Sequence, residues 1–118
     1  MAPNSLQRGD LGEELAAEYL INKGYKILER KYRFEHAEID LIAEDGEEIV
    51  FVEVKARKSK AFGDAEEAIT EAKENHVRNA AEGYLYEKNI EDRVCRFDVV
   101  AVEFHDGRAN IRHLQDAF

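Results

Sequence analysis

Apolar side chains recur along this chain either at the roughly 3.6-residue spacing of a helix or in the runs and alternating patterns of strands, and these two patterns predict where helices and strands lie. Residues 10–23 repeat apolar side chains at the spacing of an amphipathic helix, and Gly24 marks its end. The same spacing returns over residues 64–87 and predicts a second, longer helix. Apolar runs and alternating stretches predict strands over 25–34, 38–44, 48–57, 94–104 and 109–114.

The order of these elements predicts the fold class. A helix, three strands, a second helix and two strands favour an α/β fold, with a mixed five-stranded sheet and two main helices packed on it. A chain of 118 residues is long enough for one hydrophobic core but not for two. We therefore expect residues 1–118 to form a single domain.

A hairpin is expected between the second and third strands, because Asp-Gly at residues 45–46 is a strong two-residue turn signal. With these residues as the loop, Glu38 lies opposite Glu53 and Asp40 lies opposite Phe51. Asp40 is then diagonal to Glu53 on one face of the sheet, within reach of a shared ligand.

The third strand carries its own chemical signal. Strand alternation places Phe51, Glu53 and Lys55 on one face and valines on the other, which argues against a strand that is solvated on both sides. Neighbouring buried carboxylates repel one another, and their burial is costly without compensation. A divalent cation is the natural partner for Asp40 and Glu53. Two carboxylates and a lysine are also the groups that metal-assisted hydrolysis of a phosphodiester requires.

The order Asp40, hairpin, Glu53-x-Lys55 resembles the PD-(D/E)xK, or restriction-endonuclease-like, superfamily, although Ile39 replaces the proline of its name. Further motifs recur in order: Gly9-x-x-Gly12-Glu13, Tyr19-Leu20, Gly24-Tyr25-x-Ile27-Leu28, Glu38-Ile39-Asp40-Leu41-Ile42-Ala43, Val50-Phe51-Val52-Glu53-Val54-Lys55-x-Arg57, Phe62-Gly63, Arg96-Phe97-Asp98-Val99-Val100 and Asp116-Ala117-Phe118. They resemble the YraN family, bacterial proteins assigned by similarity to nucleases related to archaeal Holliday-junction resolvases. Ala37 departs from the glycine expected there.

The residues and the resemblance together imply a Mg²⁺- or Mn²⁺-dependent endonuclease. Asp40 and Glu53 are the expected metal ligands, and Lys55 is expected to orient the attacking water or to stabilise charge on the phosphate. Glu13, at the rim of the first helix's apolar stripe and in a family motif, is expected to support the metal or to ligate it. Glu38 is either a third metal ligand or a solvated residue at the start of its strand.

The expected partner is nucleic acid, DNA in particular, with branched DNA as a candidate substrate; a homodimer is left open. Candidate phosphate contacts are Arg33, Arg57, Lys58 and Lys73, the alternative for Arg57 and Lys73 being plain surface charge. The net charge of −9 argues against a polyanionic partner. However, residues 64–92 carry nine acids against three bases, or −6, while basic residues follow Glu53 directly.

Two other functions stay open at this point. One is a non-catalytic nucleic-acid-binding or adaptor module on the same fold, which the overall acidity favours. The other is an enzyme acting on a different phosphate ester. An intact set of Asp40, Glu53 and Lys55 favours catalysis over the adaptor.

The sequence also predicts the cellular compartment and the positions of the histidines and Asp98. Cys95 is the only cysteine, the first residues lack the apolar core of a signal peptide, and no stretch approaches the roughly 20 apolar residues of a membrane span. We therefore expect a cytoplasmic protein without a membrane partner. The four histidines show no ligand spacing and are expected at the surface. Asp98, on a predicted strand, is expected to form a structural ion pair.

Overall fold

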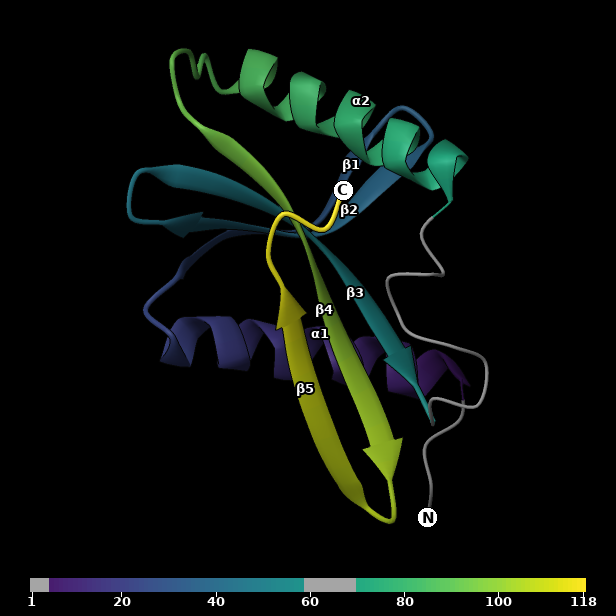
Figure 1. Cartoon of the computed structure of the whole chain (residues 1–118). Helices are drawn as coiled ribbons and strands as arrows, with labels where there is room; N and C mark the ends of the chain where they lie inside the picture. Colours follow the sequence, from purple (N-terminus) through teal and green to yellow (C-terminus); the bar gives the residue numbers. More distant parts are fainter. Residues whose placement is uncertain (1–4, 59–69) are drawn as a thin grey trace.

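The computed structural model of the chain describes residues 5–58 and 70–118 (Figure 1). Its elements are α1 (Ser5–Asn22), β1 (Lys26–Phe34), β2 (Ala37–Asp45), β3 (Glu48–Arg57), α2 (Glu71–Glu87), β4 (Cys95–His105) and β5 (Arg108–Leu114). The strands form one five-stranded sheet in the order β1-β2-β3-β4-β5. Only the β3–β4 pair is parallel, so the predicted mixed five-stranded α/β fold is confirmed.

The two helices pack on opposite faces of the sheet (Figure 1). Val50 and Val52 of β3 lie in the core under α1, whereas Ile49 and Phe51 lie in the core under α2. This alternation confirms the predicted assignment of β3 side chains to two faces. Neither helix in the described ranges is long and apolar enough to span a membrane.

The second helix is shorter than its apolar spacing predicts. Thr70 has extended backbone angles (φ −85°, ψ 163°) and is the N-cap of α2, because its side chain accepts a hydrogen bond from the amide of Lys73 at 3.1 Å. The prediction of one continuous helix over 64–87 is therefore wrong at Thr70. The predicted residues 64–69 lie outside the described part of the chain. At the other end of the chain, α1 begins at Ser5, before the predicted residue 10.

The β2–β3 hairpin has a different register from the predicted one. Asp45 pairs with Glu48, so the loop is Gly46-Glu47, and Ile42 rather than Asp40 lies opposite Phe51. The physical reason is that Gly46 has a positive φ (+62°) while Asp45 does not: a type I′ loop at Asp45-Gly46 needs a positive φ at both residues, whereas a type II′ loop needs it only at its first residue, here Gly46. The shift amounts to two residues, so the side chains of the paired residues 41–45 keep their faces, and this register continued one residue beyond Leu41 would bring Asp40 opposite Glu53.

Candidate functional site

Asp40 lies where β2 and β3 separate. The paired ladder between the two strands ends at Leu41 and Val52, and beyond that point the strands diverge (Figure 1). The amide N–H of Val54 donates instead to Asp40 Oδ2 at 2.8 Å. The carboxylate thus replaces a backbone acceptor at the end of the ladder, which fixes its position between two strands.

The surroundings of Asp40 disfavour its charged form. Burial and, after it, the nearby carboxylates of Glu53 and Glu13 raise the pKa of this carboxyl, the Val54 amide and Lys73 lower it, and the net result is a pKa of about 7. Such a group is half-protonated near neutral pH when no cation is bound. A perturbed carboxyl beside like charges is typical of functional sites.

Glu53 is the most buried acid of this group, with 4% of its side chain exposed. Its Oε1 lies 3.1 Å from Lys73 Nζ and 3.7 Å from Lys55 Nζ. Its Oε2 is buried and has no hydrogen-bond partner among the described residues. An unsatisfied buried carboxylate oxygen is costly, so this atom is available to a further donor or cation.

Glu13 reaches the same group from α1. Its Oε2 pairs with Lys31 Nζ at 2.9 Å, while its Oε1 is buried without a partner in the described part of the chain. The approach of α1 depends on Gly12, because a Cβ at this position would lie 2.5 Å from the Cβ of Ala56 on β3. A glycine is therefore required for the helix backbone to lie this close to the strand that carries Glu53. Asp40, Glu53 and Glu13, with Lys55 and Lys73, are hereafter the Asp40 site.

Glu38 and Arg33 lie at the start of β2 and the end of β1, where they pair with each other. The two residues are opposite in the β1–β2 register, and Arg33 Nε lies 3.3 Å from Glu38 Oε2. Both are substantially exposed, at 79% for Arg33 and 37% for Glu38. For Glu38 the structure shows this surface ion pair and no contact with the Asp40 site, which favours its solvated alternative.

The other predicted phosphate contacts are divided among three settings. Lys58 is exposed just beyond β3. Arg57, two residues along β3 from Lys55, has buried Nε and Nη2 groups that lack acceptors within the described ranges. Lys73 is partly exposed, and its ammonium pairs with Glu53.

The donor set of the Asp40 site fits a magnesium ion that keeps most of its water. Within residues 5–58 and 70–118, no three Asp, Glu, His or Cys side chains are arranged as a ready metal-binding group. Mg²⁺, however, is commonly held by one or two carboxylates and several waters. Asp40 and Glu53 supply two carboxylates, and the unpaired Oε2 of Glu53 is an oxygen donor with no other role.

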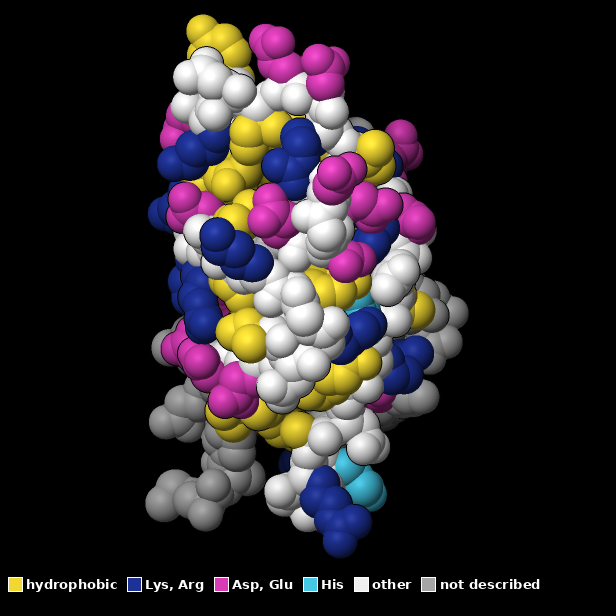
Figure 2. Space-filling model, turned by 90° about the vertical axis from the view of Figure 1, so that its left-hand side faces the viewer, with side chains coloured by type: hydrophobic (Ala, Val, Ile, Leu, Met, Phe, Trp, Pro, Cys, Tyr) yellow, Lys and Arg dark blue, Asp and Glu magenta, His cyan; other side chains and the backbone are white. Residues whose placement is uncertain are grey.

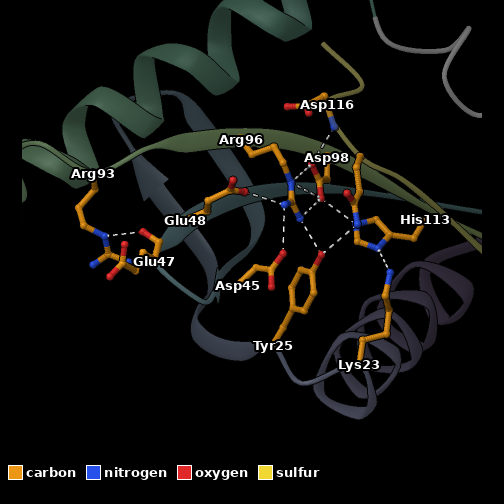
Figure 3. Close-up of polar contacts among 11 residues, drawn as sticks. Lys23, Tyr25, Asp45, Glu47, Glu48, Arg93, Arg96, Asp98, His113 and Asp116 are labelled. Carbon is orange, nitrogen blue, oxygen red and sulfur yellow. Dashed lines mark hydrogen bonds and ion pairs between the residues drawn. The ribbon is translucent and has the colours of Figure 1, made fainter.

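A second buried polar group, here called the Asp98 cluster, lies near the β2–β3 hairpin (Figure 3). Its members are Tyr25, Asp45, Glu48, Arg96, Asp98 and His113. Arg96 Nη2 lies 2.9 Å from Asp98 Oδ2, and Arg96 Nη1 lies 2.7 Å from Glu48 and 3.1 Å from Asp45. The predicted structural ion pair of Asp98 is confirmed.

His113 corrects the prediction that all histidines lie at the surface. Its side chain is 2% exposed, and its Nε2 lies 2.7 Å from Asp98 Oδ2. The Nζ of Lys23 lies 2.9 Å from Nδ1, so the ammonium donates to Nδ1 and Nε2–H donates to Asp98. The β4–β5 pairing places His113 opposite the buried Val100, and alternation along β5 was the signal that could have revealed this burial.

Comparison with known proteins places the chain in a family. Residues 12–102 match the family model described as uncharacterised protein family UPF0102. A UPF0102 protein of Chlorobium chlorochromatii is 50% identical over 123 residues, which cover 98% of this chain and 95% of the relative. A UPF0102 protein of Symbiobacterium thermophilum is 48% identical over 111 residues, or 93% of this chain and 94% of the relative. The chain therefore belongs to the UPF0102 family, which is the YraN family that its motifs resemble.

Proposed function

We propose that this protein is a Mg²⁺- or Mn²⁺-dependent nuclease that hydrolyses DNA phosphodiester bonds, with branched DNA as a candidate substrate. The observation that carries the proposal is the Asp40 site. The half-buried Asp40 lies near the buried Glu53, one oxygen of Glu53 has no partner among the described residues, and two lysines lie beside this carboxylate. The resemblance to PD-(D/E)xK nucleases supports the same chemistry.

Each residue of the site has a role in this proposal. Asp40 and Glu53 hold the metal, and Glu13 supports them from α1. A bound divalent metal polarises a phosphate oxygen and lowers the pKa of a coordinated water. Lys55, whose Nζ lies 3.7 Å from Glu53 Oε1, orients the attacking water and stabilises negative charge that develops on the phosphate.

Substrate binding is assigned to residues that follow the site along β3. The Nε and Nη2 donors of Arg57 have no acceptor among residues 5–58 and 70–118, and these two N–H groups form the planar fork that suits two oxygens of one phosphate. Lys58 adds an exposed charge next to it. Arg33 is less suited to this role, because Glu38 already neutralises it.

A non-catalytic DNA-binding or adaptor module is the second candidate, and the charge distribution favours it. The chain has a net charge of −9. On the face that Figure 2 shows, Lys and Arg side chains are interspersed with Asp and Glu, and no continuous basic surface is visible. Long-range attraction of DNA to this face is therefore weak.

The deciding experiment is cleavage of linear, flapped and four-way DNA with Mg²⁺ and with EDTA. Wild type is compared with Lys55→Ala and with Lys26→Ala, a matched loss of an exposed lysine at the start of β1. We expect metal-dependent cleavage by wild type and Lys26→Ala and none by Lys55→Ala. Salt-sensitive DNA binding without any cleavage would favour the adaptor instead. If Lys55→Ala cleaves DNA at the wild-type rate, the reaction does not take place at the Asp40 site.

A further inference from the structure

Two lysines from different elements approach the same oxygen of Glu53. Lys55 comes from β3 itself, at 3.7 Å, and Lys73 comes from the first turn of α2, at 3.1 Å. Both contacts are made to Oε1, while Oε2 remains buried and unpaired within the described ranges. The shorter of the two contacts is therefore made by α2, the helix that follows β3 along the chain.

The stability of α2 does not explain the position of Lys73. Thr70 caps this helix by accepting the amide of Lys73, so Lys73 lies in the first turn. The positive end of a helix dipole lies there, and cations are unfavourable at that end. Its two acidic neighbours in the first turn, Glu71 and Glu74, follow the usual preference. The unfavourable position of Lys73 is offset by what its ammonium contacts, namely Glu53.

We propose that Lys73 is a built-in counter-ion of Glu53, which competes with the divalent metal for this carboxylate. The inference rests on the proposed function, because it assumes that Glu53 is a metal ligand. In the metal-free protein, Lys73 at 3.1 Å adds to the more distant Lys55 in balancing the buried charge of Glu53 beside Asp40. A second cation at the same carboxylate is repelled by the ammonium, so Lys73 lowers the affinity for free metal.

The same contact gives Lys73 a role toward the substrate. Once Lys73 leaves Glu53, its ammonium is free to contact a phosphate of the DNA, because its side chain is 38% exposed. A phosphodiester that binds Lys73 draws this lysine away from Glu53 and so favours metal binding there. A metal on Glu53 in turn releases Lys73 for the phosphodiester, so each ligand favours the binding of the other. Lys73 is thus a positioning residue that makes tight metal binding depend on the presence of a polyanionic substrate.

Calorimetric titration of Mn²⁺ into the DNA-free protein tests this inference without relying on activity. The variants are Lys73→Met, Lys73→Arg and Lys88→Met. Lys88 caps the other end of α2 and pairs with Glu29 at 3.7 Å, so Lys88→Met removes the same charge from the same helix away from the site. We expect Lys73→Met to bind Mn²⁺ about tenfold more tightly than wild type, or about 1.4 kcal/mol.

Lys73→Arg and Lys88→Met should keep the wild-type affinity. A variant that only perturbs folding would not bind the metal more tightly, so the expected direction separates electrostatic competition from damage. If wild type and Lys73→Met bind Mn²⁺ equally, the counter-ion role is wrong while the metal site stands. If no variant binds Mn²⁺, the proposed metal site fails together with this inference.

Discussion

Asp98 is buried and Asp40 is half-buried in the same sheet, yet their surroundings are opposite in character. Asp98 accepts hydrogen bonds from the Arg96 guanidinium, the His113 ring and the amide of Asp116. Burial alone would raise the pKa of Asp98, but these donors, led by His113 and Arg96, lower it below its usual value. Asp40 has one amide donor beside two acids, and its pKa is raised to about 7.

This difference separates a structural acid from one that we propose to be functional. The Asp98 cluster is electrostatically satisfied and joins the β2–β3 hairpin, β4 and β5 to one another. The Asp40 site keeps mutually repelling carboxylates together, which lowers local stability and leaves oxygen atoms available for a ligand. Residues maintained for function commonly reduce stability in this way. The following substitutions test the comparison directly.

Asp98→Asn should have the largest effect on folding. The substitution keeps the shape of the side chain but removes the buried carboxylate that Arg96 and His113 contact, and it leaves Arg96 only the partly exposed Asp45 and Glu48 as charged partners. Breaking one partner of a buried ion pair costs about 3–5 kcal/mol of unfolding free energy. Urea denaturation followed by circular dichroism measures the loss. A loss within the range of ordinary surface substitutions would mean that the cluster is not structurally important.

Asp40→Asn should act in the opposite direction. Removing the repelled carboxylate should stabilise the metal-free protein by about 0.5–2 kcal/mol, as at other relieved functional sites. Because the folded pKa of Asp40 is raised to about 7, the stability of wild type falls as the pH rises from the unfolded pKa toward that value. The gain from the substitution should therefore be larger at about pH 8 than at about pH 5.

Thermal melts of both proteins with EDTA and with Mg²⁺ check this prediction. Mg²⁺ should raise the melting temperature of wild type by ligand linkage and that of Asp40→Asn much less. A destabilised Asp40→Asn protein, with no difference in its response to metal, would place Asp40 in the same structural class as Asp98.

Glu38→Gln should have the smallest effect. Glu38 forms an exposed ion pair with Arg33, and such pairs contribute about 0–1 kcal/mol. Mn²⁺ affinity, measured by calorimetry, should equal that of wild type, whereas Glu53→Gln should lose most of it. If Glu38→Gln and Glu53→Gln lose the same amount of Mn²⁺ affinity, Glu38 is a third metal ligand.

Local periodicity predicted the order of helices and strands along the chain and the two faces of β3, because alternation depends only on neighbouring residues. It placed Phe51 and Val52 on opposite faces correctly, and the structure shows that Phe51 packs under α2 and Val52 under α1. The hairpin register was not predictable from the sequence, since Asp45-Gly46 and Gly46-Glu47 are both acceptable loops and the backbone angle φ of Asp45 decides between them. The observed register, continued one residue beyond Leu41, would bring Asp40 opposite Glu53 rather than diagonal to it.

Contacts between distant elements were predicted less well. The ion pair of Lys73 with Glu53 depends on where α2 begins, and apolar spacing continued the helix across Thr70. The burial of His113 depends on the pairing of β5 with β4, which spacing between histidines does not reveal. Asp40, Glu53, Lys55 and Glu13 were nominated from the sequence, and their metal and catalytic roles stay predictions.

The contact between Gly12 and Ala56 sets a limit on how this family's sequences can change. Only one methyl group fits between α1 and β3 at this point, and Ala56 already supplies it. A larger residue at either position would move the helix outward and carry Glu13 away from Asp40. The two positions therefore share a fixed volume, and an alanine at position 12 is compatible with the same spacing only if position 56 becomes glycine. Substitutions at these two positions should thus occur in pairs, although neither side chain takes part in the chemistry.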